Sequence, residues 1–485
     1  MSLSRRQFLR RSAAASAALL VPNTLQLLAA RMAGAAGRAS LVARGYGPLR
    51  PDPAGLLALP EGFRYRAFST SRLGSEDDRR FTQRLSNGEL VPARHDGMHA
   101  FPGPAGLTIL VRNHELEPAH KPVVDPDGRR RYDRLGTAGT TTLWVDGERN
   151  LVRSFPSLAG TFRNCAGGAT PWGSWLSAEE CVYLPGPRDP RVDDRRPEAA
   201  ERHGYVFEVD ARAEALVDPV PIRAMGRFYH EALAVDPASG TVYLTEDRPD
   251  GLLYRYRPEV VASGEKRVAD MTVGDLGRGG TLEALRIAER PAALTHNWQA
   301  AGFVPGRDWA VDWVAIPVVD PDVDMERDAA FAPPRTAPTS TRAQGFRSGA
   351  AQFARNEGIT LHRGSLYFCA TAGGRKRTGQ VWRLDLEAQR LSLLIEPNDP
   401  AALDGPDNLA PAPNGDLIVC EDGESDNFIV GITPRGRLYK LARDTSGTSE
   451  LAGACFAPDG RTMFVNTQDP GITFAIWGPW EKRAD

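Results

Sequence analysis

The amino-acid sequence predicts an all-β fold, a six-bladed β-propeller with long loop insertions and few helices. The first observation is a repeated unit: a short strand preceded by polar residues, a turn with glycine, a second strand ending in polar residues, and an outer amphipathic strand. The second is composition, because 48 glycines and 38 prolines in 485 residues indicate many turns. Such a unit cannot bury its faces alone, so its repetition favours blades stacked around a channel. A β-sandwich, or two of them, is the alternative.

The strand candidates combine aromatic and β-branched residues between turn formers. Two stretches, 185–202 and 318–347, are expected to be surface insertions, because the mature chain exceeds six minimal blades. The best helical candidate is Asp275–Ala293, which contains Thr281–Leu285. The strand candidates, in chain order, are 63–68, 107–111, 139–146, 172–177, 205–210, 226–232, 240–247, 251–256, 358–362, 364–371, 379–385, 406–410, 415–422, 436–441, 454–456, 463–466 and 472–477.

Residues 1–40 are expected to form a signal peptide rather than part of the fold. Ser4–Leu9 reads SRRQFL, a twin-arginine pattern, and the weakly apolar run Ala13–Ala30 follows it. A basic amphipathic helix is the alternative reading of this stretch. The twin-arginine export machinery is therefore an expected partner, and the mature protein is expected in the periplasm or outside the cell without a stable membrane anchor. Residues 41–485 are expected to form a single catalytic propeller domain.

Charge and cysteine usage exclude several classes of partner and site. The 59 basic and 61 acidic residues nearly cancel, and no aromatic-interleaved basic patch stands out, so neither nucleic acid nor an anionic membrane surface is predicted. Five cysteines are an odd number for an oxidising compartment, so at least one is expected to be unpaired or bound to something. With no CxxC and no HExxH spacing, a zinc site is not expected.

The stretch Asn164–Cys181 (NCAGGATPWGSWLSAEEC) combines residue types that few structural needs call for. Its glycines and proline mark a turn, and Trp172–Ser177 alternates large and small residues as a strand does. Cys165 and the pair Glu179-Glu180 are therefore expected at strand ends on one rim. A thiolate is a soft ligand and carboxylates are hard ones, so a site that uses both suits a transition metal better than calcium alone. The alternative is a buried cysteine beside a solvated acidic pair.

Polar residues recur at strand ends that a propeller brings together at its channel. So many carboxylates cannot stay ionised together without cations, so a multi-metal centre is expected, with calcium and a transition metal. The planar guanidinium group of Arg355 is suited to bidentate contact with an anionic substrate such as phosphate. Taken singly, each residue can also be a solvated loop acid or a turn former. The set comprises Asn113, His114, Glu115, Asn164, Cys165, Glu179, Glu180, His230, Glu231, Glu246, Asp247, Arg355, Glu357, Asp407, Asn408, Glu421 and Asp422.

Several of these motifs together resemble the PhoX alkaline phosphatases, and the resemblance covers most of the mature chain. The motifs are Asn113–Glu115, Asn164-Cys165 with Thr170–Glu180, Gly226–Glu231 (GRFYHE), Arg355–Gly358 (RNEG) and Pro406–Leu409 (PDNL). The resemblance implies a six-bladed propeller, exported by the twin-arginine route, that hydrolyses small-molecule phosphate esters at a cluster of Fe(3+) and Ca(2+). It also implies metal-assisted hydrolysis, in which metal ions polarise the phosphoryl oxygens while an oxygen attacks in line.

The resemblance also assigns expected roles to single residues. Cys165 would be a thiolate ligand of iron, and Glu231 and Glu357 carboxylate ligands of the iron pair. Glu179 and Glu180 would bind metals of the cluster, calcium among them. The expected catalytic residues are Arg355, which would hold the phosphate, and Asn164.

The chain departs from the family pattern at a few positions. Ser177-Ala178 precedes the acidic pair where the family usually has a cysteine, Cys181 follows it, and Asn356 stands where the family usually has proline. These changes leave the expected ligands in place. Two other functions stay open: a calcium-only propeller hydrolase, such as a lactonase or a phytase-like enzyme, and a non-catalytic periplasmic binding propeller. Cys165 argues against the first, because a calcium-only site has no use for a thiolate.

Overall fold

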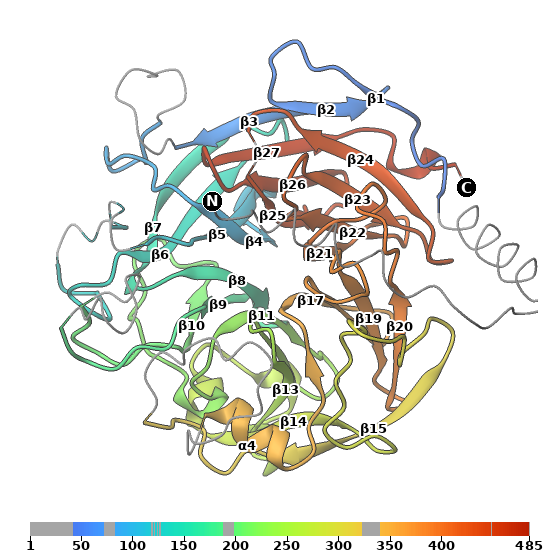
Figure 1. Cartoon of the computed structure of the whole chain (residues 1–485). Coiled ribbons are helices and arrows are strands. Elements are labelled where there is room, and N and C mark those ends of the chain that lie inside the picture. Colours follow the sequence, from blue (N-terminus) through green and yellow to red (C-terminus); the bar gives the residue numbers. More distant parts are fainter. Residues whose placement is uncertain are drawn as a thin grey trace, which may run out of the picture. The chain divides into compact units, whose positions relative to one another are not determined.

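Six inner strands surround the centre of the fold, and each begins a run of antiparallel strands (Figure 1). The computed structural model describes residues 42–71, 83–117, 120, 122–123, 125, 128–187, 198–322, 340–447 and 449–484. The inner strands contact one another in chain order, β4 with β8, then β11, β17, β21 and β25, and β25 contacts β4 again. The ring is therefore closed with six blades, which confirms the predicted propeller.

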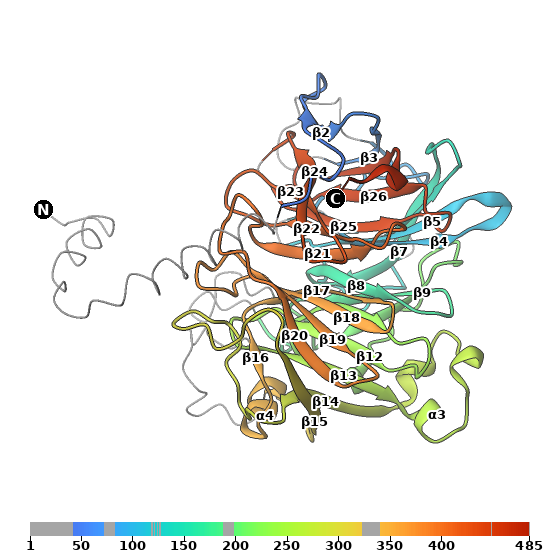
Figure 2. The same cartoon turned by 90° about the vertical axis from the view of Figure 1, so that its right-hand side faces the viewer.

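Each blade is a run of antiparallel strands that leads outward from the inner strand. Figure 2 shows β17 and β21 side by side when the ring is seen at 90° to Figure 1. The blades are I, β4 (His95–Pro102), β5 (Thr108–His114), β6 (Ala138–Val145) and β7 (Leu151–Thr161); II, β8 (Asn164–Ala169), β9 (Ser174–Glu179) and β10 (Val206–Asp210); III, β11 (His230–Val235), β12 (Val242–Glu246), β13 (Gly251–Pro258) and β14 (Gly280–Ile287); IV, β17 (Asn356–His362), β18 (Ser365–Ala370), β19 (Gln380–Asp385) and β20 (Arg390–Ile395); V, β21 (Pro406–Pro411), β22 (Leu417–Glu421), β23 (Phe428–Ile432) and β24 (Leu438–Asp444); and VI, β25 (Leu451–Phe456), β26 (Thr462–Thr467), β27 (Ile472–Trp477) and β3 (Arg64–Thr70).

Blade VI joins the two ends of the described chain. Its three inner strands are the last strands of the chain, while its outer strand β3 comes from the beginning, and β27 pairs with β3 from Ile472↔Thr70 to Trp477↔Arg64. Hydrogen bonds of one sheet thus close the ring.

A few elements lie outside the blades. The short strands β1 (Leu49–Arg50) and β2 (Leu57–Pro60) extend blade V beyond β24, and β16 (Gln352–Phe353) pairs with β13. The strand β15 (Asp308–Ala315) links β14 to β20, so blades III and IV share one sheet. Among the described residues, α-helix is confined to α3 (Glu259–Ala262) and α4 (Thr341–Arg347), as expected of a chain with few helices.

The predicted helix over Asp275–Ala293 is wrong. Asp275–Arg278 forms one 3-10 turn, and the strand β14 follows at once. Leu282 and Ala284 are buried while Glu283 pairs with Arg255 of the neighbouring strand (Nε to Oε2, 2.8 Å). The side chains therefore alternate with period two. Leu, Glu and Ala favour a helix by propensity, but pairing with β13 and β15 overrides it.

Apolar side chains fill the spaces between the blades. Between blades III and IV, Trp309 and Trp382 are fully buried and pack with Phe353 and Phe368. Burying each large side chain contributes about 2 to 3 kcal/mol, so these contacts between blades, with the ladders within them, hold the ring together.

Several predictions fall outside the described residues. The chain divides into Met1–Val42 and Ala43–Asp485, and the propeller belongs to the second unit. The twin-arginine signal lies outside the description, as do residues 188–197 and 323–339 of the two expected insertions. The signal, the export route and the periplasmic location stay predictions. No helix within the described ranges has the length and apolarity that a membrane span requires.

Candidate active site

The same backbone irregularity recurs near the start of all six inner strands. In each blade, two residues of the inner strand lie opposite one residue of its neighbour. For example, Asp96 and Gly97 face Asn113 between the pairs His95↔His114 and Met98↔Arg112. The other five shifts lie at the corresponding points of β8, β11, β17, β21 and β25. One extra residue of this kind is a β-bulge, which bends the strand and re-aims a side chain.

The first residue of each bulge forms a ring around the channel, which we call the bulge ring. Five of its six members carry a carboxylate or a thiol. The sixth is Gly453, whose φ is +64° and where an added Cβ would lie 2.4 Å from the carbonyl oxygen of Asp96. The bulge ring consists of Asp96, Cys165, Glu231, Glu357, Asp407 and Gly453.

Two further rings are joined by a repeated backbone hydrogen bond. The residue after the second strand of each blade donates its N–H to the carbonyl of a residue just ahead of the inner strand, at 2.7 to 3.2 Å. The donors, which we call the outer ring, are Glu115, Glu180, Asp247, Thr371, Asp422 and Gln468. The acceptors, which we call the entry ring, are Arg94, Arg163, Tyr229, Arg355, Gly405 and Glu450, in the same blade order.

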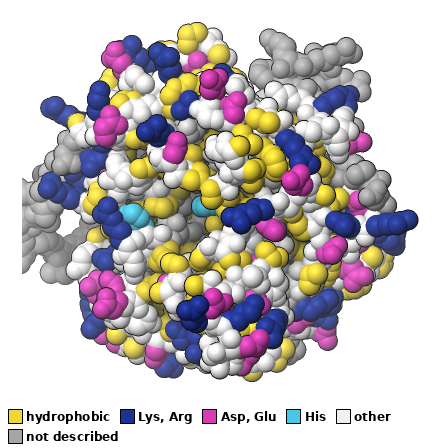
Figure 3. Space-filling model, turned by 180° about the vertical axis from the view of Figure 1, so that it is seen from behind, with side chains coloured by type: hydrophobic (Ala, Val, Ile, Leu, Met, Phe, Trp, Pro, Cys, Tyr) yellow, Lys and Arg dark blue, Asp and Glu magenta, His cyan; other side chains and the backbone are white. Residues whose placement is uncertain are grey.

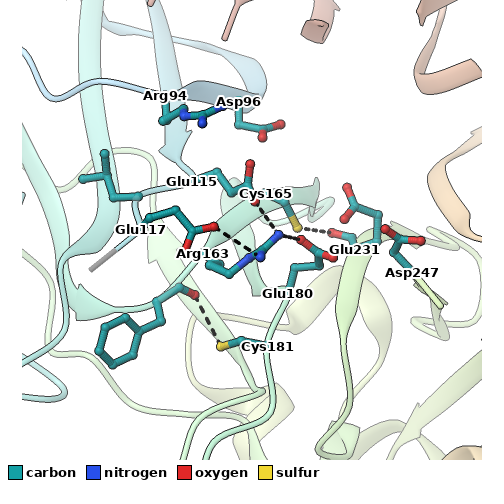
Figure 4. Close-up of polar contacts among 12 residues, drawn as sticks. Arg94, Asp96, Glu115, Glu117, Arg163, Cys165, Glu180, Cys181, Glu231 and Asp247 are labelled. Carbon is teal, nitrogen blue, oxygen red and sulfur yellow. Dashed lines mark hydrogen bonds and ion pairs between the residues drawn. The ribbon is translucent and has the colours of Figure 1, made fainter. Parts of the chain in front are cut away.

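Members of all three rings line one cavity of about 290 Å³ at this end of the channel. Ten carboxylates and three arginines line it among the described residues, together with Cys165 and Gln468. Figure 4 shows Cys165, Glu180 and Glu231 turned toward one another, with Arg163 between Glu115 and Glu180. Carboxyl groups outnumber the cationic side chains of the cavity, so any of them that are ionised repel one another.

Within the described part of the chain, three groups of donor atoms in this cavity are close enough to hold a metal ion. In each group the three atoms lie within 4.8 Å of one another. One group combines sulfur with oxygen, and the other two hold carboxylates alone, with Glu231 common to two groups. The groups are Cys165 with Glu180 and Glu231; Asp96 with Glu115 and Glu450; and Glu231 with Glu357 and Asp407.

Burial and mutual repulsion disfavour the charged forms of these carboxyl groups. Burial first, and then neighbouring carboxylates, raise the pKa of Asp96, Glu231, Glu357 and Glu450 well above the ordinary range. The same causes raise the pKa of Asp407 to about 8. Such a cluster is ionised at neutral pH only when cations offset its charge, so the donor set fits bound metal ions.

Cys165 follows the same rule. Burial raises the pKa of its thiol, and Glu231 and Glu180 raise it further. Its Sγ donates to the backbone oxygen of His230 at 3.4 Å. A thiolate at this position requires a cation beside it. All five cysteines of the chain are buried and unpaired, which confirms that at least one would be free.

The guanidinium group of Arg355 lies in the cavity, and its Nε and Nη2 are hydrogen-bonded. Its Nη2 lies 2.9 Å from Asp247 Oδ2 and 2.7 Å from Glu357 Oε1, and its Nε lies 3.0 Å from Asp247 Oδ1. Asp247 and Glu357 therefore raise its pKa and fix its orientation. Its side chain is 37% exposed, so Nη1 is left to contact a ligand.

Glu179 does not share the environment of Glu180, although the two are adjacent. Its Oε2 accepts from the N–H of Gly204 (2.8 Å) and its Oε1 from the N–H of Phe162 (3.0 Å), while Oε1 also lies 2.6 Å from His203 Nδ1. Consecutive side chains of a strand point to opposite faces, so Glu179 faces the blade interior and Glu180 the cavity. This placement does not fit the expected ligand role of Glu179.

Asn164 also lies away from the cavity. Its Nδ2 donates to Ser177 Oγ (2.8 Å) and its Oδ1 accepts from Thr161, and the residue is fully buried. These contacts fit a residue that fixes the start of β8 better than the expected catalytic role.

The other predicted strand-end residues divide in the same way. Glu115, Asp247, Asp407 and Asp422 line the cavity. Asn113, His114, His230, Glu246, Asn408 and Glu421 do not, and several are held within the blades: Glu246 pairs with Arg342 and Glu421 with Lys440. Asn113 donates from Nδ2 to the carbonyls of Cys165 (3.2 Å) and Ala166 (2.7 Å), so it fixes the bulge that carries the thiol.

Sequence reasoning missed six lining residues. These are Arg94, Asp96, Glu117, Arg163, Glu450 and Gln468. Of these six, only Asp96 had a signal in the sequence: an acid or cysteine followed by a small residue recurs as Asp96-Gly97, Cys165-Ala166, Glu231-Ala232 and Glu357-Gly358. The small residue is needed because the next blade packs on it, and a Cβ on Gly97 would lie 2.5 Å from Ala166 Cα.

The other end of the channel holds a second cavity, of about 540 Å³, lined by later residues of the same inner strands. Among its lining residues are Met98, Ala169, Leu233, Ile359, Leu409 and Cys455. On the face seen in Figure 3, hydrophobic side chains gather near the middle between scattered charged groups.

The chain is similar to one protein family and to several solved structures. The family model described as alkaline phosphatase PhoX matches residues 44–471. Among solved structures, Pseudomonas fluorescens PhoX in complex with vanadate, described as a transition state analogue, is similar with a TM-score of 0.61 at 18% identity, covering 90% of this chain and 98% of that one. A Xanthomonas campestris gluconolactonase reaches a TM-score of 0.39 at 12% identity, covering 85% of this chain and 98% of that one. No curated protein matches the chain.

Proposed function

This chain belongs to the PhoX alkaline phosphatase family, and we propose that it hydrolyses phosphate esters with a cluster of iron and calcium ions held in the acidic cavity of the propeller. The observation that carries the proposal is the bulge ring. Five blades each direct one metal-competent side chain to the same cavity from an equivalent position. Structural ion pairs do not require such repetition.

The mixed donor group is the proposed place of iron. Cys165 supplies a soft sulfur, and Glu180 and Glu231 supply hard oxygens, a combination that favours a transition metal. The carboxylate groups of Asp96 with Glu115 and Glu450, and of Glu357 with Asp407, suit calcium or the harder side of an iron pair. Ions in the first and third groups would share Glu231.

Arg163 holds two of these carboxylates in place. Its Nη2 lies 2.7 Å from Glu115 Oε1 and 2.5 Å from Glu180 Oε2, and Nη1 lies 3.3 Å from Glu117 Oε1. Glu180 keeps Oε1 for a metal ion, whereas Glu115 Oε2 also accepts from Gln468 Nε2 at 2.8 Å and can offer a metal ion only its other lone pair. Groups that orient metal ligands in this way typically change metal affinity by about 10- to 100-fold when they are removed.

Arg355 is the proposed phosphate-binding residue. Asp247 and Glu357 hold its Nε and Nη2, so the guanidinium is oriented before substrate binds and Nη1 remains for a phosphoryl oxygen. Bound metal ions would polarise the phosphoryl oxygens and offset the charge that develops as the ester bond breaks. The charged lining positions the phosphate through ionic contacts rather than through apolar ones.

Elemental analysis of the purified protein, with its visible absorption spectrum, tests the proposal. We expect iron and calcium together, with a thiolate-to-ferric charge-transfer band. Exhaustive chelation is expected to reduce the hydrolysis of p-nitrophenyl phosphate to background, and addition of both ions to restore it. Circular dichroism of the chelated protein checks that the loss does not reflect unfolding.

Two results would contradict the proposal. Calcium without iron would overturn the role of Cys165 and favour a calcium-only propeller hydrolase. Full hydrolysis by a protein without bound metal would overturn the cluster as the working centre.

A further inference from the structure

The three arginines of the entry ring differ in their partners. Arg163 contacts three carboxylates and Arg355 contacts two. Arg94 forms no ion pair with a carboxylate among the described residues: its Nη1 donates to the Oε1 of Gln468, and its buried Nε has no hydrogen-bond partner. All three adopt positive φ, +52° at Arg94, +46° at Arg163 and +57° at Arg355, which is uncommon for residues other than glycine.

Arg94 and Arg355 face the cavity from opposite sides. Both accept the equivalent backbone hydrogen bond, from Glu115 (3.0 Å) and from Thr371 (2.9 Å), and both line the cavity. Arg94 precedes blade I and Arg355 precedes blade IV, which lie three blades apart in a closed ring of six. The metal-competent carboxylates line the same cavity as the two guanidinium groups. Figure 4 shows Arg94 beside Asp96, above Glu115.

The lack of a carboxylate partner separates Arg94 from the arginines that hold ligands. The cavity offers ten carboxylates, and an arginine that served only to offset their charge would pair with them, as Arg163 does. The charge of Arg94 is therefore left for an anion that enters the cavity. An arginine fork suits phosphate in particular.

We propose that Arg94 is a specificity residue that binds a second phosphate group, carried by the leaving alcohol of the substrate, while Arg355 holds the phosphate that is hydrolysed. The preferred substrates are then phosphate esters that bear two phosphate groups separated by a short linker. This inference rests on the proposed function, because it requires Arg355 to hold the reacting phosphate.

The test compares propane-1,3-diol bisphosphate with propane-1,3-diol monophosphate, which differ only in the second phosphate. Arg94→Gln keeps a side chain that can contact Gln468 but removes the charge. We expect it to lower kcat/KM for the bisphosphate about tenfold or more, mainly through KM, as is typical when a charged hydrogen bond is lost. For the monophosphate we expect a change below about threefold, and Arg94→Lys should restore part of the loss.

Three measurements make the result specific. Arg355→Gln should lower kcat/KM for both esters. Arg153→Gln, which removes an arginine paired with Glu214 outside the cavity, should change neither. The iron and calcium content of Arg94→Gln should equal that of the wild type.

The outcomes separate this inference from the proposed function. Equal losses on both esters would overturn it and make Arg94 structural, and no loss on either would show that Arg94 does not contact the substrate. A metal-loaded wild type that hydrolyses neither ester would overturn the proposed function itself, and this inference with it.

Discussion

The two ends of the channel are lined by the same six strands and yet differ completely in chemistry. At one end the first residues of the bulges, with their neighbours, present carboxylates, a thiol and arginines. Two or more residues further along the same strands, Met98, Leu233, Ile359 and Leu409 line the other cavity. The position along the strand, and not the identity of the blade, therefore decides which chemistry a residue serves.

The difference shows how a propeller separates stability from function. The ladders and the apolar contacts between blades extend over the whole length of the inner strands, whereas the charged groups are confined to the bulge and to the residues beside it. Burial raises the pKa of the bulge-ring carboxyl groups, so their charged forms are unfavourable at this end unless cations offset their mutual repulsion. The ladders and apolar contacts therefore offset the electrostatic cost of the acidic end.

The largest expected effect comes from replacing, one at a time, two cysteines that lie at opposite ends of the channel. Cys165 and Cys455 are equally buried, at 4% and 3% exposure, but Cys165 lines the acidic cavity and Cys455 the apolar one. Cys165→Ala should lose most of the iron and at least roughly 100-fold in activity, more than removal of an outer contact would cost. Elemental analysis and phosphate-ester hydrolysis measure both.

Cys455→Ala is the matched control. It should lower the free energy of unfolding by about 1 kcal/mol and leave metal content and activity unchanged, because its site is apolar. Iron content equal to that of the wild type in Cys165→Ala would remove the thiolate ligand from the proposal.

The second prediction uses two adjacent glutamates to separate stability from metal binding. Glu179→Gln breaks a buried contact with His203 and should lower the free energy of unfolding by about 4 kcal/mol while the metals stay. Glu180→Gln should lose metal and activity but change the stability of the metal-free protein little. Urea unfolding of the metal-free proteins, with elemental analysis of the loaded ones, gives both quantities. If Glu179→Gln instead lost metal while its free energy of unfolding stayed unchanged, Glu179 would be a metal ligand as the sequence predicted.

The smallest effect is a pH dependence of stability away from the cavity. Burial alone would lower the pKa of His203, but Glu179 and Asp133 raise it to about 9. Because the folded pKa lies above the unfolded value of about 6.5, the charged histidine contributes up to about 3 kcal/mol below pH 6.5, and this contribution is lost as pH rises through 9. The free energy of unfolding of the metal-free protein should fall over that range more steeply than that of His203→Gln. Parallel pH curves for the two proteins would contradict this.

The sequence was sufficient to predict the blades but not the facing of single side chains. Alternation and turn residues located most strands, since they reflect local burial. Glu179 and Glu180 are adjacent and chemically alike, and only the pairing Asn164↔Glu179 shows which of them reaches the cavity. A bulge is a relation between two strands, so no periodicity within one strand reveals it.

Glu450 and Gln468 are two cavity residues that could not be recognised from the sequence. Glu450 lies ahead of β25, whose start the sequence reading placed at Ala454 rather than Leu451, so its closeness to the channel was not visible. Gln468 follows β26 in the same way as Glu115 follows β5, but an amide among acids did not stand out. Both positions became recognisable through the repeated backbone hydrogen bond and not through residue type.

The closure of blade VI has a consequence for the order of events during synthesis. Glu450 and Gln468 belong to the last blade, and β27 must find β3, about 400 residues earlier in the chain, before the ring is complete. A nascent chain that still lacks its final strands therefore has five blades and no finished cavity. We expect the proposed metal ions to bind only after β27 has paired with β3, and a truncation of the last two strands to remove metal binding together with the fold.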